Sequence, residues 1–184
     1  DGAYEGLTKA RALTPAEMIA SVEASGLRGR GGAYFPVALK WQAAIDASAL
    51  NARPLLVVNA EEGEPGVFKD RVLMESDPHR LVEGVAIACH AIGAEHAYIY
   101  INGQADLSAE RVEVALVDAE AADLLGDLVV EIRRGAGGYV CGEETVILES
   151  IEGRRAVPRL RPPFPTERGL FGRPTVINNV ETLA

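Results

Sequence analysis

Glycine and cationic residues gather in one short stretch of the chain, residues 26–40, where they could bind an anion. The stretch opens with Gly-Leu-Arg-Gly-Arg-Gly-Gly, and Pro36 then begins a helical pattern. Glycines let the backbone take positive φ and approach a ligand closely. A helix N-terminus adds unpaired N–H groups and the positive end of its dipole. With Arg28, Arg30 and Lys40 nearby, the stretch predicts a phosphate site, although it matches neither GxxxxGK[ST] nor a strand-linked GxGxxG.

A second group of candidate residues is acidic: Glu61, Glu62 and Glu64 follow a short apolar run. Two interpretations stay open. A charge cluster of this kind is typical of a solvated loop. Alternatively, the carboxylates accept hydrogen bonds from ribose hydroxyls or a ring N–H, and repel an additional 2′-phosphate. The second interpretation predicts a preference for NADH over NADPH.

A second glycine-rich segment, residues 135–144, ends in Glu143-Glu144 and is either a tight turn or a second binding loop. Within it, Cys141 is expected to be a small buried side chain, as is Cys89. Two cysteines cannot ligate a four-thiolate cluster, and the three histidines have no metal-like spacing, so we predict no metal site. Neither GxSxG nor HExxH occurs. If the protein is an enzyme, a cofactor carries its chemistry.

The composition is that of a soluble globular protein, with 184 residues, 48% of them hydrophobic and 24% charged. The formal net charge of −9 argues against nucleic acid as a partner. No apolar run reaches the length of about 18 residues that a membrane span needs. We therefore expect a cytoplasmic protein without direct membrane insertion, which could reach the cytoplasmic face of a membrane only through partner subunits.

Helical and strand patterns alternate along the middle of the chain. Helices are predicted at residues 14–25, 36–48, 77–93 and 108–125, with a short one ending at 152. Strands are predicted at residues 55–58, 98–101 and 128–133. The segments 59–71, 135–144 and 158–174 are expected to be irregular because of their glycine and proline content. The alternation predicts an α/β fold, Rossmann-like, with a mostly parallel sheet flanked by helices.

Five segments carry a resemblance to a known family. They are GLRGRGGAYFP (26–36), NAEEGEPGVFKDR (59–71), GYVCGEET (138–145), PRLRPPFP (158–165) and NNVET (178–182). In this order they resemble the NADH-binding flavoprotein subunit of respiratory complex I, the 51 kDa subunit. Related proteins are subunits of NAD-reducing hydrogenases and of NAD-dependent formate dehydrogenases. The resemblance covers residues 1–184 as an FMN- and NADH-binding domain with glycine-rich loops around the pocket.

The resemblance implies an FMN cofactor and NADH as the substrate. The residues matching FMN-binding positions are Gly29, Arg30, Gly31, Gly32, Lys40, Asn59, Glu61, Glu62, Tyr139, Gly142, Glu143, Asn178, Asn179 and Thr182. Those matching NADH-binding positions are Phe35, Glu64, Glu144, Arg161 and Phe164. Hydride would pass from NADH to the flavin, and electrons onward to an iron–sulfur partner. No residue is expected to act as a catalytic acid or base; Glu64 and Glu144 would position NADH.

The chain also departs from the family pattern. Tyr34 stands where the family usually has glycine, Val37-Ala38 replaces Thr-Gly, and Ala43 replaces an aromatic residue of some members. The alternative is therefore a non-catalytic homologue, a binding or assembly module that has lost FMN. A third possibility is a flavin reductase with a soluble acceptor. The family continues into a ubiquitin-like domain and a four-Cys domain, so a [4Fe–4S] cluster is expected only if such a C-terminal domain exists.

Overall fold

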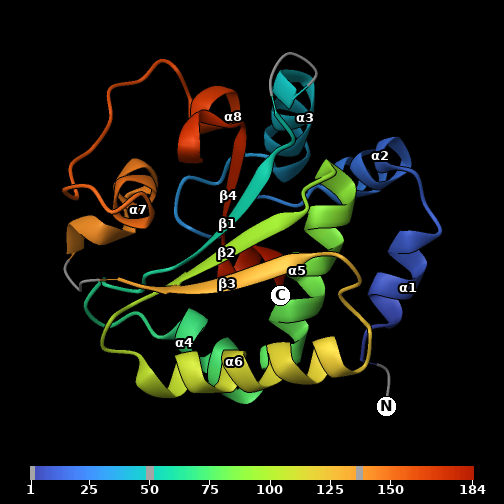
Figure 1. Cartoon of the computed structure of the whole chain (residues 1–184). Coiled ribbons are helices and arrows are strands. Elements are labelled where there is room, and N and C mark those ends of the chain that lie inside the picture. Colours follow the sequence, from blue (N-terminus) through green and yellow to red (C-terminus); the bar gives the residue numbers. More distant parts are fainter. Residues whose placement is uncertain (1–2, 49–51, 136–138) are drawn as a thin grey trace.

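A four-stranded parallel sheet organises the computed structural model, which describes residues 3–48, 52–135 and 139–184 (Figure 1). Its strands are β1 (Leu55–Ala60), β2 (His96–Ile101), β3 (Val129–Arg134) and β4 (Thr175–Asn179). They lie in the order β3-β2-β1-β4, and every pair is parallel. The α/β fold with a parallel sheet that the sequence predicts is confirmed.

Helices surround the sheet. They are α1 (Glu5–Arg11), α2 (Pro15–Ser25), α3 (Val37–Ser48), α4 (Lys69–Ser76), α5 (Pro78–Ile92), α6 (Asp106–Ala121), α7 (Glu144–Ile151), α8 (Pro165–Arg168) and α9 (Val180–Leu183). Two short 3₁₀ turns, η1 (Tyr139–Gly142) and η2 (Leu170–Gly172), complete the described structure. Within the described ranges, no helix is both long enough and apolar enough to cross a bilayer.

The two faces of the sheet carry separate hydrophobic cores, because successive strand residues point to opposite faces. On one face Leu56, Val58 and Ile99 pack with residues of α5 and α6. On the other, Val57 and Tyr98 pack with α7 and η2. Figure 1 shows α5 and α6 on one side of the sheet and α7 on the other. The sheet is thus covered on both faces, as parallel sheets require.

The helix ends that the sequence marks most clearly are confirmed. The Thr14 hydroxyl accepts from the Glu17 N–H, and the Glu17 carboxylate accepts from the Thr14 N–H, which completes the capping box before α2. Gly26 ends α2 with φ 67°, and Gly93 ends α5 with φ 70°. These caps depend only on neighbouring residues, so sequence alone locates them.

Five helices and strands of the described structure were not predicted from the sequence: α1, α4, α8, α9 and β4. Helix α4 begins inside the segment expected to be irregular, because the Glu62 carboxylate accepts from the N–H groups of Asp70 and Arg71 at 2.9 and 3.1 Å. Likewise, Glu83 of α5 accepts from the Leu7 N–H of α1 at 2.9 Å. Glu62 lies eight and nine residues before these N–H groups, and Glu83 lies 76 residues after Leu7, so neither contact follows the local capping pattern. The prediction of irregular structure throughout residues 59–71 was therefore wrong. It was also wrong for residues 158–174, which contain α8 and η2.

The path of the chain creates a crevice at one edge of the sheet. From β1 the chain crosses to β2 and then β3 on one side, whereas β4 pairs on the other side of β1. Val58 lies opposite Asn178 and Asn59 opposite Asn179, so the carboxyl ends of both strands carry polar side chains. Ligands of open α/β sheets bind at such a switch point.

Gly84 sets the spacing between α5 and α9, and we expect Gly84→Ala to destabilise the protein. A Cβ there would lie 2.0 Å from the Leu183 carbonyl oxygen. Alanine normally stabilises a helix over glycine by about 0.5–1 kcal/mol. Here the overpacking should dominate and lower the free energy of unfolding by about 1–3 kcal/mol.

Urea unfolding checks this expectation, with Gly6→Ala in α1 as the control. The Cβ at position 6 would lie 2.9 Å from Glu83 Oε1, the movable end of a side chain, so a smaller loss is expected. A Gly84→Ala variant more stable than the parent chain would show that the two helices can separate freely.

Candidate functional site

A cavity of about 310 Å³ lies at the crevice between the ends of β1 and β4. Nine of the residues predicted to bind the cofactor line it: Gly29, Gly31, Lys40, Asn59, Gly142, Glu143, Asn178, Asn179 and Thr182. They come from the loop before α3, α3 itself, the ends of β1 and β4, the segment before α7, and α9. The fold therefore brings together most of a set that is scattered through the sequence.

The first glycine loop is a tight hairpin that leads into α3. The Gly29 N–H donates to the Phe35 carbonyl at 2.9 Å, and the Val37 N–H donates to the Leu27 carbonyl at 3.1 Å. From α9, the Thr182 hydroxyl accepts from the Arg30 N–H at 2.9 Å. The loop is thus fixed at its base and its middle, which leaves its tip to face the cavity.

The tip of this loop offers backbone donors. In the described part of the chain, no group accepts a hydrogen bond from the N–H of Gly31, Gly32 or Ala33. Gly31 and Ala33 line the cavity, and Gly32 has φ 105°, which a residue with a side chain rarely adopts. Unpaired N–H groups next to a helix start suit a phosphate. The loop therefore fits the group that its sequence predicts.

Tyr34 adopts a left-handed conformation at φ 58°, where glycine would carry no steric cost. For a residue with a side chain this conformation costs roughly 1–2 kcal/mol. Its carbonyl accepts from the Arg28 guanidinium at 3.2 Å, which helps to hold the turn. The side chain is 59% exposed and lines the cavity, so the ring lies at the rim and the cavity is open beside it.

A second cavity, of about 870 Å³, adjoins the first. The two share the lining residues Ala33, Phe35, Lys40, Glu144, Arg161 and Ile177. Four of the five residues predicted for NADH line the larger cavity: Phe35, Glu144, Arg161 and Phe164. Both phenylalanines are about half exposed, at 49% and 53%, so their rings are free to stack on a base. Glu64 is exposed and lines neither cavity.

Paired charges mark the junction of the two cavities. Lys40 Nζ donates to Glu144 Oε1 and to the Ile177 carbonyl, both at 3.0 Å. The Arg161 guanidinium contacts the Glu143 carboxylate and lies 3.9 Å from Glu144 Oε2. Glu143 also caps α7 by accepting from the N–H groups of Thr145 and Val146. Carboxylates at the N-terminus of α7 thus hold the Lys40 and Arg161 side chains in place.

Three asparagines occupy the strand ends, and the side-chain amide of each makes hydrogen bonds to other protein groups. Asn178 Oδ1 accepts from the buried Trp41 indole at 2.9 Å. Asn59 Nδ2 donates to the Gly142 carbonyl at 3.0 Å, while its Oδ1 accepts from the Glu61 N–H at 3.1 Å. Asn59 therefore ties the second glycine-rich segment to β1.

The Asn179 amide is fully engaged by protein groups that sequence reasoning missed. Its Nδ2 donates to Asp70 Oδ2 at 2.5 Å, and its Oδ1 accepts from Lys69 Nζ at 2.7 Å and from the Glu181 N–H at 3.1 Å. Asp70 is 3% exposed, and burial raises the pKa of its carboxyl. Asn179 therefore shapes the cavity wall. The only signal for Lys69 and Asp70 was their position within the 59–71 motif.

Glu61 and Glu62 lie outside the lining of both cavities. Glu62 caps α4, whereas Glu61 is 6% exposed and lies next to Gly135 and Gly142. Asn102 donates to Glu61 Oε1 at 2.7 Å, and Oε2 is buried with no hydrogen-bond partner among the described residues. A Cβ at Gly135 would lie 2.3 Å from that oxygen and 3.0 Å from the Tyr100 ring, so a side chain there would displace buried groups. Burial raises the pKa of the Glu61 carboxyl. The predicted roles of both residues toward FMN stay predictions.

The thiols are those of buried side chains, as expected. Burial raises the pKa of Cys141, and the nearby Glu61 charge adds to that effect. Burial also raises the pKa of Cys89. The predicted role of Tyr139 rests on a side chain outside the described residues. Among the residues that are described, no cluster of three potential metal ligands occurs.

The chain resembles known proteins over most of its length. A family model described as the Nuo51 FMN-binding domain matches residues 22–184. A subunit of an NADH-quinone oxidoreductase of Rhizobium meliloti is 51% identical over 192 residues, which cover 100% of this chain and 45% of that protein. The corresponding subunit in Aquifex aeolicus is 48% identical over 193 residues, covering 100% and 44%. The chain thus spans less than half the length of these relatives.

A solved structure is similar as well. A crystal structure of an NAD+-reducing [NiFe]-hydrogenase in the H2-reduced state matches with a TM-score of 0.86 and 43% sequence identity. The match covers 94% of this chain and 30% of the hydrogenase chain. The likeness therefore extends to sequence and fold together.

The buried Glu61 carboxyl should make stability fall as pH rises. The unfolded carboxyl ionises near the ordinary value of 4.5, while the folded one keeps its proton to higher pH. Between these values the unfolded chain binds fewer protons, so the free energy of unfolding decreases with pH. We expect Glu61→Gln to remove this decrease, so that the variant gains on the parent chain above pH 4.5.

Urea unfolding of both proteins across the range from acidic to mildly alkaline pH measures that difference. The pKa of Asp70 is raised too, but its effect on the pH dependence of unfolding is the same in both proteins and disappears from their difference. Parallel pH curves for the parent and Glu61→Gln would contradict the assignment.

Proposed function

This chain belongs to the Nuo51 FMN-binding domain family, and from that premise we propose that it binds FMN in the smaller cavity and NADH in the larger one. Its reaction would be hydride transfer from NADH to FMN. The family expected from the five sequence motifs is confirmed. The observation that carries the proposal is the pair of adjoining cavities, one lined by the predicted flavin residues and the other by the predicted NADH residues.

The residues of the smaller cavity fit a flavin mononucleotide. The free N–H groups of Gly31, Gly32 and Ala33 would hold its phosphate, with the start of α3 behind them. When bound, FMN supplies the hydride acceptor and the route by which electrons leave singly. The chain supplies binding and orientation. Asn59 connects β1 to Gly142, and Asn178 connects β4 to Trp41 of α3, so both hold the walls of the site in place.

In the larger cavity, Phe35 and Phe164 would stack on the adenine of NADH. Lys40 and Arg161 lie where the two cavities meet, and they would contact the dinucleotide phosphates there. Glu144 now pairs with Lys40, so a bound phosphate would compete for that cation. Glu64 is proposed to favour NADH over NADPH by repelling a 2′-phosphate, together with Glu144.

We also propose that electrons pass from this domain to an iron–sulfur protein of a larger redox complex. The support is that the relatives are named as subunits of NADH-quinone oxidoreductases, and the structural match is a hydrogenase. Any association with the cytoplasmic face of a membrane would then depend on those partners. The alternative of a module without FMN finds no support in the comparisons, and Tyr34 leaves the cavity open.

The first prediction from this proposal concerns colour. The chain mixed with FMN should show flavin absorption bands after gel filtration, and those bands should bleach when NADH is added without air. NADPH should bleach them at least tenfold less efficiently if the carboxylates exclude the 2′-phosphate. A chain that does not retain FMN would refute the proposal at its first step, and retained FMN that NADH does not bleach would refute the hydride transfer.

The second prediction tests the phosphate loop through Gly31. A Cβ at this position would lie 3.3 Å from Asn179 Cβ, at the wall of the smaller cavity, and would crowd the N–H groups that face it. We expect Gly31→Ala to weaken FMN binding about tenfold or more, a loss of about 1.4 kcal/mol. Titration followed by flavin fluorescence measures the affinity, and thermal unfolding of the FMN-free variant is the control. Unchanged affinity would place the phosphate elsewhere.

A further inference from the structure

Residues 155–164, which we call the proline arm, link α7 to α8 and are largely exposed. Leu160, in the middle of the arm, is 93% exposed. Yet Arg161 and Phe164 of the same arm form part of the larger cavity. The arm therefore needs an anchor other than a hydrophobic core if these two side chains are to keep their places.

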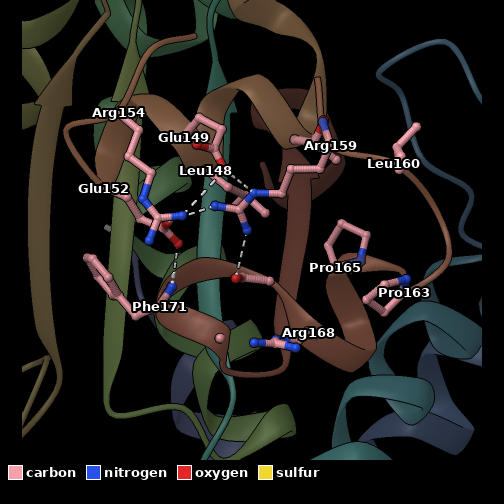
Figure 2. Close-up of a pocket in the computed structure, with 13 residues that line it drawn as sticks. Leu148, Glu149, Glu152, Arg154, Arg159, Leu160, Pro163, Pro165, Arg168 and Phe171 are labelled. Atoms are coloured by element: carbon pink, nitrogen blue, oxygen red, sulfur yellow. Dashed lines mark hydrogen bonds and ion pairs between the residues drawn. The ribbon is translucent and has the colours of Figure 1, made fainter. Parts of the chain in front are cut away.

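Arg159 provides that anchor, as Figure 2 shows. Its Nε donates to Glu149 Oε1, its Nη2 lies 2.8 Å from Glu152 Oε2, and its Nη1 donates to the Gly169 carbonyl at 3.0 Å. Its backbone N–H donates to the Thr145 hydroxyl at 2.8 Å. One residue of the arm thus contacts two side chains of α7, the Glu152 side chain just after α7, and the Gly169 carbonyl just after α8.

The carboxylates in this cluster are shielded from water. The side chains of Glu149 and Glu152 are 11% and 5% exposed, and they lie at the end of α7. Glu152 also accepts from the Phe171 N–H at 2.7 Å. Two buried like charges need a cation between them. A planar guanidinium can serve three acceptors in fixed directions, which a lysine ammonium cannot do with the same geometry.

Arg154 offers a natural comparison within the same cluster. Its Nη1 lies 3.2 Å from Glu152 Oε2 and 3.9 Å from Glu149 Oε1. Its side chain is 66% exposed, and it precedes the proline arm. Arg154 therefore shares the carboxylates of Arg159 without holding the arm.

We propose that Arg159 is a positioning residue for the dinucleotide: its contacts hold the proline arm so that Arg161 and Phe164 wall the larger cavity. This inference rests on the proposed function, because it concerns the NADH site. Arg161 lies two residues after Arg159, and Phe164 lies five residues after it. Loss of the Arg159 contacts would therefore let both side chains move. A released arm must be ordered again whenever the ligand binds, and that ordering weakens binding.

The test compares Arg159→Lys, Arg159→Met and Arg154→Met in the 184-residue chain loaded with FMN. Calorimetry measures the binding of ADP-ribose, a fragment of NADH that cannot transfer hydride. NADH oxidation with ferricyanide as the acceptor gives KM and kcat. Both Arg159 variants should bind ADP-ribose at least tenfold more weakly and show a KM raised by the same factor, with kcat and FMN affinity within about twofold. Arg154→Met should stay within about twofold throughout.

Chymotrypsin supplies a readout that needs no ligand, since Leu160 is an exposed cleavage site. Cleavage there should be faster in Arg159→Lys than in the parent chain or Arg154→Met. ADP-ribose binding by Arg159→Lys at the parental affinity would overturn the inference. So would a joint loss of FMN binding, ADP-ribose binding and thermal stability, which marks a purely structural role. A parent chain that holds FMN but neither binds ADP-ribose nor oxidises NADH would refute the proposed function itself, and this inference with it.

Discussion

The pairing of β4 with β1 is the constraint on which the rest of the structure depends. It brings residues about 120 positions apart in the sequence into register, with Asn59 opposite Asn179. Helix α9 follows β4 directly, and its Thr182 holds the first glycine loop at Arg30. The crevice, its polar walls and the loop that closes it therefore all follow from one strand pairing. Without β4, the motifs at residues 26–36 and 59–71 would have no common site.

Around this crevice the protein buries carboxyl groups, and each is stabilised in a different way. Asp70 lies against Lys69 and the Asn179 amide, and Glu149 against the Arg159 guanidinium. Within the described ranges, the Glu61 carboxyl accepts a hydrogen bond from the Asn102 amide at one oxygen and has no partner at the other. Burying a carboxylate is costly, which is why burial raises the pKa of Glu61 and also that of Asp70, although Lys69 and Asn179 oppose the rise at Asp70. Burial of these carboxyl groups lowers the stability of the fold, while their hydrogen bonds and ion pairs fix the positions of the loops and of the proline arm.

Sequence predicts those parts of this structure that depend on neighbouring residues or on motifs. The capping box at Thr14, the glycine stop at Gly93 and the alternation of strands and helices were all predictable. The sequence also identified most residues that line the smaller cavity, but only a minority of those that line the larger one. By contrast, α4 depends on a cap from Glu62 and β4 on its partner strand, so neither has a local signal. The anchoring role of Arg159 could not be predicted either, because its partners lie on α7 and after α8.

An acidic protein that binds an anionic cofactor needs donors that its own carboxylates cannot neutralise. The side-chain cations at the site do not meet this need by themselves, because Lys40 pairs with Glu144 and Arg161 with Glu143. Backbone N–H groups at the tip of the glycine loop carry no net charge and are fixed by the fold, so nearby glutamates leave them free. The geometry of the loop can then provide the specificity for a phosphate. The ion pairs Lys40–Glu144 and Arg161–Glu143, where the two cavities meet, hold the proline arm and α7 in position. The net charge of −9 and a phosphate site are compatible for this reason.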